Sequence, residues 1–422
     1  MVETKKELIA LIDAEQDQHL ELLQDLIRTP SPNPPGDTRD AIEIVRKYLA
    51  RYSIRSEIID PKATSPKLVS TLQDDPRKDT RHLILNSHID QFPVDKSEQW
   101  KRSPYSSDID GGFVHGRGSV DMKAGTAASI IAFTYLHRFR AQLHGQAVLE
   151  VVSDEETGGK FGTKYLLEQD ERKPLWRGGC VLNAEPDGLS SIRVGEKGTL
   201  RMAFNVECVG RHGAYLNKSE GAIRIAARLI ARLVDLEQLP VAMDPELKEY
   251  LLRPDVSKVA YSIMGPGAAD LMLRPSVNVG TIQGGTKVNM IPSSCTFEVD
   301  IRLPTGLVAE DVLSHIDSIL KNFPGVTYEV QQAATNRAAA SPLDHEIVRL
   351  LQSNVADNGS TKPLPIFSLG ATDCKHFRYC GMPAYTYGPS PETMAEKDEK
   401  VGVQGFLDTV KVHTLTAWDY LH

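Results

Sequence analysis

Apolar residues recur at intervals of three and four along the first part of the chain. They are Leu8, Leu11, Ile12, Leu20, Leu23 and Ile27. This spacing predicts one long helix from Lys5 to Thr29, which the proline-rich segment 30–36 must end because proline lacks an amide donor. The same kind of pattern predicts further helices over 38–52, 121–139 and 161–169.

Short apolar runs typical of β-strands alternate with these helices. They lie at Lys67–Leu72, His82–Asn86, Gln146–Ser153 and Cys180–Asn183. Strands that alternate with helices indicate a mainly parallel sheet covered by helices on both faces. We therefore expect an α/β fold for this part of the chain.

The pattern changes near Glu196-Lys197-Gly198. Strands are predicted at 199–209, 277–282, 295–302 and 326–331, with helices at 221–236 and 308–322. This β-α-β-β-α-β order predicts a separate α+β sandwich with one exposed sheet face. The α/β pattern resumes after residues 337–342. We therefore expect a small domain, residues 198–334, inserted into a larger discontinuous domain of residues 1–197 and 335–422.

The composition narrows the possible partners and compartment. The chain has 422 residues, with 48 Lys and Arg against 56 Asp and Glu, a net charge of −8. Because the charges are spread along the chain, neither nucleic acid nor a membrane surface is expected as a partner. The five cysteines include no Cys-x-x-Cys pair, which argues against a thiolate zinc site. We interpret them as reduced thiols of a cytoplasmic protein.

Polar residues gather where strands of the predicted parallel sheet end and where a helix begins, which is where open α/β folds bind ligands. They are His88, Asp90, Asp121, Glu155, Glu156 and Glu185. Taken singly, His-x-Asp also fits a surface turn, Asp121 a helix N-cap, and the paired glutamates a solvated turn. Taken together, one histidine and several carboxylates without thiolates are the ligand set of a hydrolytic site with one or two divalent metals.

Nine short motifs follow one another along nearly the whole chain: Ser-Pro-Asn-Pro-Pro-Gly-Asp (31–37), Ser-His-Ile-Asp (87–90), Gly-Arg-Gly-Ser-Val-Asp-Met-Lys (116–123), Ser-Asp-Glu-Glu-Thr-Gly-Gly (153–159), Ala-Glu-Pro (184–186), Gly-Arg-His-Gly-Ala-Tyr (210–215), Lys-Val-Asn-Met-Ile-Pro (287–292), Asp-Ile-Arg (300–302) and Gly-Ala-Thr-Asp (370–373). With these motifs in this order, the chain resembles the metal-dependent aminoacylase and carboxypeptidase family. That family includes acetylornithine deacetylase, succinyl-diaminopimelate desuccinylase and glutamate carboxypeptidase.

The resemblance implies a metal centre. His88, Asp121 and Glu185 would form one metal site, and Asp121 would bridge to a second metal bound by Glu156. Asp90 would orient His88, as a carboxylate behind a metal-binding imidazole commonly does.

The resemblance also implies the remaining catalytic groups. Glu155 would act as general base on the attacking water. The inserted domain would be a lid and a dimerisation surface, and His212 would enter a neighbouring subunit's site to stabilise the oxyanion. Asn289 and Arg302 match substrate-contacting positions. Two alternatives stay open: an intradomain salt bridge for Arg302 and a surface loop position for His212.

One motif departs from the family. A histidine near the C-terminus is the family's last metal ligand, but the segment 394–399 here reads Met-Ala-Glu-Lys-Asp-Glu, which puts Glu396 in its place. The other nearby histidines, His376 and His413, do not fit the motif. Carboxylate in place of imidazole shifts the preference from Zn²⁺ towards Mn²⁺, Co²⁺ or Mg²⁺. An intact site with two metals, a single-zinc site and a weakened site all remain open.

The sequence therefore predicts a metal-dependent hydrolase that cleaves the amide bond of an N-acyl amino acid, a dipeptide or a related carboxylate-bearing amide. We expect Zn²⁺ as cofactor and a homodimer formed through the inserted domain. The alternative is a non-catalytic relative that binds a small ligand at an impaired metal site. A redox or nucleotide-binding protein is poorly supported, because Gly111-Gly112 and Gly158-Gly159 lack the spacing of a phosphate-binding loop.

Overall fold

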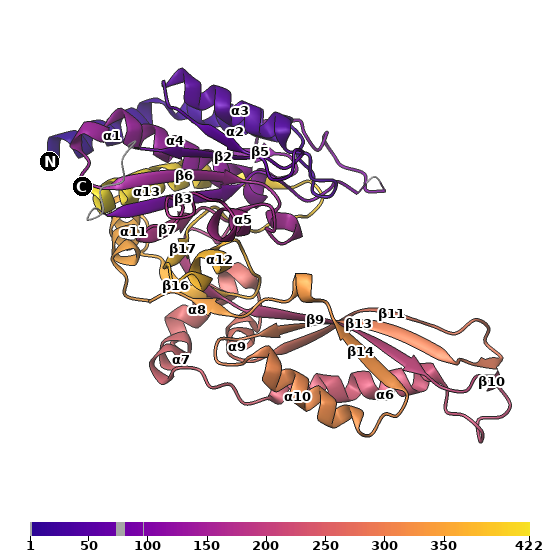
Figure 1. The fold of residues 1–422 in the computed structure, drawn as a ribbon. Coiled ribbons are helices and arrows are strands. Elements are labelled where there is room, and N and C mark those ends of the chain that lie inside the picture. Colours follow the sequence, from indigo (N-terminus) through magenta and orange to yellow (C-terminus); the bar gives the residue numbers. More distant parts are fainter. Residues whose placement is uncertain (1, 73–80, 96) are drawn as a thin grey trace. The chain divides into compact units, whose positions relative to one another are not determined.

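The computed structural model describes residues 2–72, 81–95 and 97–422, which form two compact units. The larger unit contains the described residues of Met1–Val194, Ser341–Ile366 and Thr372–His422, and the smaller contains Gly195–Ala340 and Phe367–Ala371. Figure 1 shows both as ribbons.

The larger unit is built on a mixed sheet that is parallel in its centre. The strands lie in the order β1 (Glu57–Ile59), β2 (Lys67–Thr71), β6 (Gln146–Val152), β3 (His82–His88), β7 (Cys180–Asn183), β17 (Ala384–Thr386) and β8 (Ser191–Glu196). β3 is parallel to both β6 and β7, and β17 is parallel to β7. β15 (Ala339–Ala340) and β16 (Leu364–Ser368) pair with β8. The predicted α/β fold with a mainly parallel sheet is confirmed.

Helices cover both faces of this sheet (Figure 1). They are α1 (Val2–Ala14), α2 (Gln16–Arg28), α3 (Arg39–Arg51), α4 (Ala124–Arg138), α5 (Thr163–Glu168), α11 (Glu346–Asp357), α12 (Cys374–Tyr379) and α13 (Val403–Leu421). α4 packs along α13 and against β3 and β6. On the opposite face, Leu166 of α5 and Phe377 of α12 pack on Ile84, Val148 and Val181 of the central strands.

Two helix predictions need correction. The single helix expected from Lys5 to Thr29 is two helices, divided at Glu15, whose carboxylate binds Tyr135 and Arg138 of α4. These tertiary contacts leave no trace in the apolar periodicity. The helix expected to begin at Asp121 begins at Ala124, because Asp121 has non-helical backbone angles (φ −115°, ψ 100°) in an irregular turn over Ser119–Lys123.

The smaller unit contains an antiparallel sheet in the order β11 (Ser276–Gly284), β13 (Ser294–Leu303), β9 (Gly198–Glu207) and β14 (Val326–Val330). Helices α6 (Ala222–Val234) and α10 (Ala309–Leu320) cover one face. The sequence of β13 explains why only one face is covered. Buried Phe297, Val299 and Ile301 alternate along the strand with more exposed residues. The buried side chains pack on Leu229 of α6 and Ile316 of α10. The predicted β-α-β-β-α-β order is present.

The smaller unit also contains elements that the sequence patterns did not predict. They are the helices α7 (Pro245–Leu251), α8 (Pro254–Met264) and α9 (Ala268–Leu273) and the short paired strands β10 (Arg211–His212) and β12 (Met290–Ile291). In the larger unit, β4 (Ile109–Asp110), β5 (Phe113–His115) and β18 (Lys400–Gly402) form a small separate sheet. Over the described ranges, no helix has both the length and the apolar character needed to cross a membrane.

Candidate metal centre

The parallel strands β6, β3 and β7 deliver the predicted ligands to one edge of the sheet. His88 is the last residue of β3, and Glu185 follows two residues after β7 ends at Asn183. Glu155 and Glu156 occupy a short helical turn after β6. Asp154, the residue just before this turn, has a positive φ of 79°. Because parallel strands end at the same edge, residues about 100 positions apart in the chain come together.

His88 is almost completely buried, and its two ring nitrogens face different partners. Nδ1 lies 3.0 Å from the main-chain oxygen of Asp90 and 3.5 Å from its Oδ1. Nε2 lies 3.2 Å from Asp121 Oδ1 and 3.3 Å from Glu185 Oε1, yet it has no hydrogen-bond partner among the described residues. A proton on Nδ1 that is donated to the Asp90 carbonyl leaves the Nε2 lone pair available to a metal.

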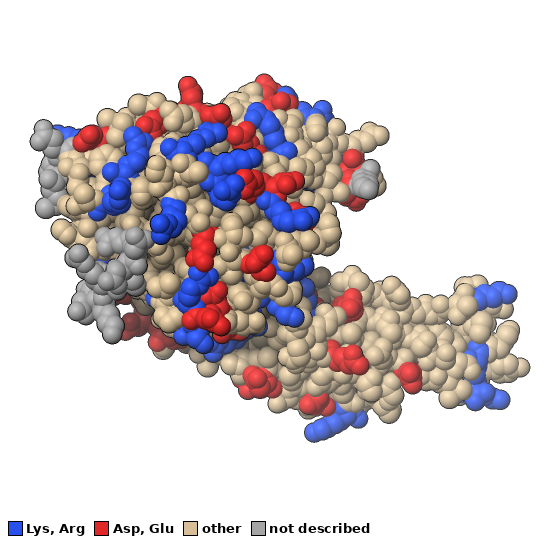
Figure 2. Space-filling model, turned by 45° about the horizontal axis from the view of Figure 1, so that its top comes forward, with Lys and Arg blue, Asp and Glu red and all other residues tan. Residues whose placement is uncertain are grey.

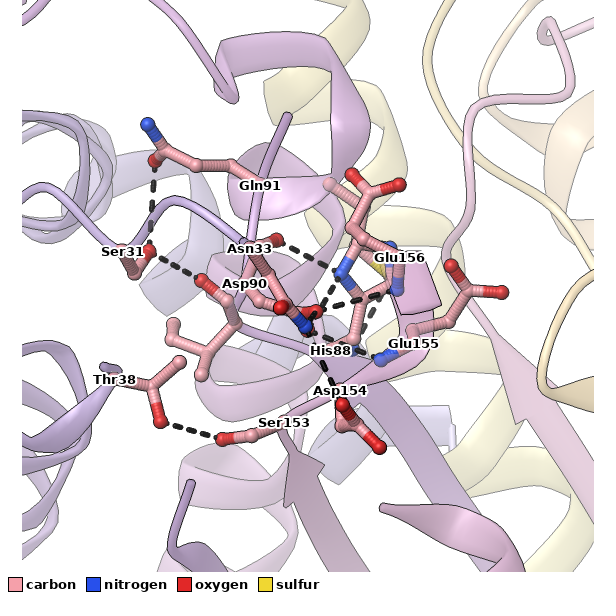
Figure 3. A network of polar contacts seen from close by, with 12 residues as sticks. Ser31, Asn33, Thr38, His88, Asp90, Gln91, Ser153, Asp154, Glu155 and Glu156 are labelled. Carbon is pink, nitrogen blue, oxygen red and sulfur yellow. Dashed lines mark hydrogen bonds and ion pairs between the residues drawn. The ribbon is translucent and has the colours of Figure 1, made fainter. Parts of the chain in front are cut away.

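The Asp90 carboxylate organises the loop that carries the two glutamates (Figure 3). It accepts hydrogen bonds from the main-chain N–H of Glu155 at 3.3 Å, from that of Glu156 at 3.2 Å, and from Asn33 Nδ2 at 2.8 Å. Asn33 belongs to the motif 31–37, to which sequence analysis assigned no role. Ser31 of the same motif donates to the Ile89 carbonyl at 2.6 Å. The motif therefore braces the strand end that carries His88.

The ligand atoms fall into two overlapping groups. One contains His88, Glu155 and Glu185 and the other His88, Asp121 and Glu156, and within each group the atoms lie within 4.8 Å of one another. Oε1 of Glu156, like Nε2 of His88, is buried and lacks a hydrogen-bond partner among the described residues. Buried, unpaired carboxylate and imidazole atoms that converge in this way fit a divalent metal ion.

The electrostatics of the site support the same conclusion. Burial raises the pKa of Glu155 well above its usual range, and the charges of Glu185 and Asp373 add to the effect. Burial and then the neighbouring Asp121 likewise raise the pKa of Glu156 and Glu185. Like charges crowded into a buried site repel one another unless protons or a cation compensate them. A divalent cation would supply that compensation.

The structure does not bring Glu396 into either ligand group. Glu396 is exposed, and neither His376 nor His413 joins a group among the described residues. The C-terminal loop instead reaches the site through Glu399, which sequence analysis missed. Buried Glu399 pairs with Arg117 at 2.8 Å and accepts from the main-chain N–H of Val120 at 2.8 Å, next to Asp121. The sequence did contain one signal for Glu399, namely its place at the end of the segment 394–399 that departs from the family motif.

The smaller unit holds the other three predicted residues at two separate places. His212 and Asn289 are exposed and lie side by side, since β10 pairs with β12 and Gly213 N–H donates to the Asn289 carbonyl at 2.8 Å. Arg302 pairs with Thr199 near the start of β9, whereas His212 follows the end of β9. Arg302 also donates to Asp300 at 2.9 Å, the salt bridge considered as its alternative role.

One histidine and four carboxylates, three from strand ends and Asp121 from the turn before α4, form the ligand set of a metal-dependent hydrolase on an α/β fold. The family model described as peptidase family M20/M25/M40 matches residues 84–419. The chain belongs to this family of metallopeptidases and deacylases, which act on peptides or amides.

Two kinds of deacylase are among the relatives of this chain. The succinyl-diaminopimelate desuccinylase 2 of Ruegeria sp. is 25% identical over 395 residues, which cover 91% of this chain and 90% of that enzyme. An N-formyl-4-amino-5-aminomethyl-2-methylpyrimidine deformylase of Halalkalibacterium halodurans is 37% identical over 165 residues, which cover 39% of this chain and 38% of that enzyme.

Solved structures share the fold at low sequence identity. The family M20 metallo-carboxypeptidase Sso-CP2 of Sulfolobus solfataricus matches with a TM-score of 0.78 at 17% identity, covering 95% of this chain and 99% of that one. Human carnosine dipeptidase 1 matches with a TM-score of 0.71 at 16% identity, covering 99% of each chain. These matches extend over both units.

Proposed function

We propose that this enzyme hydrolyses the amide bond of an N-acyl amino acid, a dipeptide or a related small amide with a free carboxylate. The observation that carries the proposal is the convergence of His88, Asp121, Glu155, Glu156 and Glu185 at one sheet edge. The names of the desuccinylase and dipeptidase relatives support an acylated amino acid or a dipeptide as substrate. The alternative of a non-catalytic binding protein is not favoured, because the relatives and structural neighbours of this chain are enzymes.

The residues of the site would have different roles in the reaction. His88, Asp121 and Glu185 would hold one divalent ion, and Asp121 with Glu156 a second. A bound ion of this kind activates water and polarises the substrate carbonyl. Glu155 takes the proton from the attacking water and returns it to the leaving amine. Burial raises the pKa of Glu155 above its usual range, and a raised pKa favours a carboxylate that both accepts and returns a proton.

We propose Zn²⁺ for the site that contains His88, because imidazole with carboxylates suits zinc. The second site offers mostly oxygen ligands and would accept Mn²⁺, Co²⁺ or Mg²⁺. Glu396 occupies the position of the family's histidine ligand. Because Glu396 is exposed and outside both ligand groups, we propose that the second site forms without it.

We also propose a homodimer formed through the smaller unit. β11 is an edge strand, and Ile223, Ile282 and Met290 are 40%, 51% and 51% exposed. Exposed apolar side chains beside an open strand edge favour pairing with a second copy. Arg302 stands opposite Thr199, near the start of β9, whereas His212 follows the other end of β9. These two ends of the strand are about 26 Å apart, because a strand rises about 3.3 Å per residue. This separation favours the proposal that His212 stabilises the oxyanion in the site of a second copy, while Arg302 holds a substrate carboxylate.

The expected partner is thus a small molecule together with a second copy of the chain. Figure 2 shows Lys and Arg side chains interspersed with Asp and Glu over the larger unit's visible face, without a uniform basic surface for nucleic acid. The five cysteines are free thiols, three of them buried, which supports a place in the cytoplasm.

Substrate hydrolysis with defined metals tests the proposal. The metal-free protein is assayed with an N-acyl amino acid series, a dipeptide series and an N-formyl amine, after Zn²⁺ or Mn²⁺ is added back. We expect turnover of at least one carboxylate-bearing amide that a chelator abolishes. Turnover of the N-formyl amine alone would overturn the carboxylate requirement and favour the chemistry named for the deformylase relative. Metal binding without any turnover would restore the binding-protein alternative.

A further inference from the structure

Three buried polar side chains cross the central strands of the larger unit directly below the metal ligands. Asn86 of β3 stands opposite Glu150 of β6 and opposite Asn183 of β7 in the strand register. All three are 0–1% exposed. Such a row is costly inside a sheet unless every group finds a partner.

The row lies on the same face of the sheet as the ligands. Asn86 lies two residues before His88 in β3. Because side chains two residues apart in a strand point to the same face, Asn86 and His88 share one face of the sheet. Asn183 is the last residue of β7, and Glu185 lies two residues beyond it. One step further down, Ile84 packs in the apolar cluster against α5 and α12. The polar row is therefore a layer between the core and the metal centre.

Hydrogen bonds join this layer into one chain. Asn183 Nδ2 donates to Asn86 Oδ1 at 3.1 Å, and Asn86 Nδ2 donates to Glu150 Oε2 at 3.3 Å and to Thr163 Oγ1 at 3.2 Å. Thr163 then donates to Asp373 Oδ2 at 2.7 Å. The amide of Asn86 thus uses both of its N–H groups and its oxygen, which fixes its orientation.

The chain of hydrogen bonds ends on a metal ligand. Asn183 Oδ1 accepts from the main-chain N–H of Glu185 at 2.8 Å. The layer therefore ties the end of β7 to β3, whose last residue, His88, has its Nε2 only 3.3 Å from Glu185 Oε1. A shift of one strand by a single residue would turn its ligand to the other face of the sheet, so register at this edge decides whether the two ligands meet.

We propose that Asn86, Asn183 and Thr163 are positioning residues that hold His88 and Glu185 in the geometry required to bind metal. The inference rests on the metal site of the proposed function. It differs from a plain structural role in one respect: loss of the layer weakens metal binding beyond what loss of stability alone would cause. Partners behind metal ligands commonly contribute about 10–100-fold to metal affinity.

Metal affinity, measured by competition between the metal-free protein and a chelator for Zn²⁺, tests the proposal without any substrate. The variants are N86L and N183L, and the matched control is N354L. Asn354 is also a buried asparagine, 1% exposed, whose Nδ2 donates to Leu350 O and Asp419 Oδ2 at 3.0 Å, away from the ligands. Thermal unfolding of each metal-free variant reports its loss of stability.

We expect N86L and N183L to bind Zn²⁺ about 10–100-fold more weakly than the wild type, and N354L to bind within about twofold, at comparable losses of stability. Equal affinity in all three variants would overturn the inference while leaving the proposed function standing. Failure of the wild-type protein to bind either Zn²⁺ or Mn²⁺ would instead overturn the proposed function.

Thr163 supplies a milder pair of variants that keeps the test decisive if N86L does not fold. T163V removes the hydroxyl that links Asn86 to Asp373 at nearly constant volume, and T163S keeps it. We expect weakened zinc binding and a lower kcat at little changed KM for T163V, with both restored in T163S. Wild-type zinc affinity in T163V would overturn the role of the layer.

Discussion

The carboxylate of Asp90 accepts a hydrogen bond from the main-chain N–H of Glu156 at 3.2 Å, while its main-chain oxygen faces His88 Nδ1 at 3.0 Å. One residue thus fixes both a ring that can bind metal and the loop that carries the proposed base. Burial opposes the charge on Asp90, but hydrogen bonds from His88 and Asn33 outweigh it and lower its pKa. Asp90 therefore stays ionised as an acceptor.

The variant D90N replaces one acceptor oxygen with a donor, which faces either the main-chain N–H of Glu155 or the N–H groups of Glu156 and Asn33. We expect kcat to fall about 10–100-fold and zinc affinity to fall with it, because outer partners of metal ligands contribute at this level. Steady-state kinetics and chelator competition measure the two effects. The exposed Asp95 provides the control, since D95N should change neither. Kinetics of D90N within twofold of the wild type would contradict the role of Asp90.

Glu155 is proposed as a base although its carboxylate lies in the same group as the ligand atoms of His88 and Glu185. The variant E155Q separates these roles, because glutamine keeps the shape but cannot accept the proton. We expect kcat to fall about 10²–10⁴-fold at unchanged zinc content, measured by elemental analysis. E168Q, at an exposed glutamate, is the matched control. Loss of zinc from E155Q would make Glu155 a ligand instead.

The sequence was sufficient where function depends on strand ends. The apolar runs before His88 and Glu185 predicted a parallel sheet, and parallel strands must end at one edge. It was insufficient where a tertiary contact decides the local conformation. The turn at Asp121 depends on Glu399, far along the chain, and the bracing of Asp90 by Asn33 crosses 57 positions. Neither contact has a periodicity that a sequence pattern could show.

The two glutamates offered for the second metal occupy different environments. Glu156 has an unpaired buried oxygen near His88 and Asp121, whereas Glu396 is exposed. We expect E156A to lose metal from the second site and E396A to retain the wild-type metal content per chain. Elemental analysis after dialysis against a limited excess of Zn²⁺ or Mn²⁺ measures both. Loss of metal from E396A would show that the exposed loop closes over the site when metal is present.

The proposed dimer predicts a specific sensitivity of the smaller unit. A charge at Ile282 on the edge strand β11 should oppose association with a second copy, so I282K should shift the protein towards a monomer. Sedimentation velocity measures the state. If His212 serves a second copy's site, the monomeric variant should also lose kcat at unchanged metal content. A dimeric and active I282K would place the interface elsewhere.

Glu150 makes the stability of the protein depend on pH. Burial raises its pKa to about 8, against the opposing hydrogen bond from Asn86, whereas glutamate in an unfolded chain has a pKa of about 4.3. Between these values the native state binds the extra proton. The stabilisation is complete below about pH 4.3 and is lost as the pH rises through about 8, by at most about 1.4 kcal/mol per pH unit.

The variant E150Q cannot ionise and should lack this slope. We therefore expect it to gain in free energy of unfolding relative to the wild type as the pH is raised from about 5 to about 8, measured by urea unfolding of both proteins. The comparison cancels the titration of the metal ligands, which both proteins share, and E168Q should follow the wild type. An equal pH slope in E150Q and the wild type would mean that Glu150 is ionised in the core throughout this range, with its charge compensated by the polar layer around Asn86.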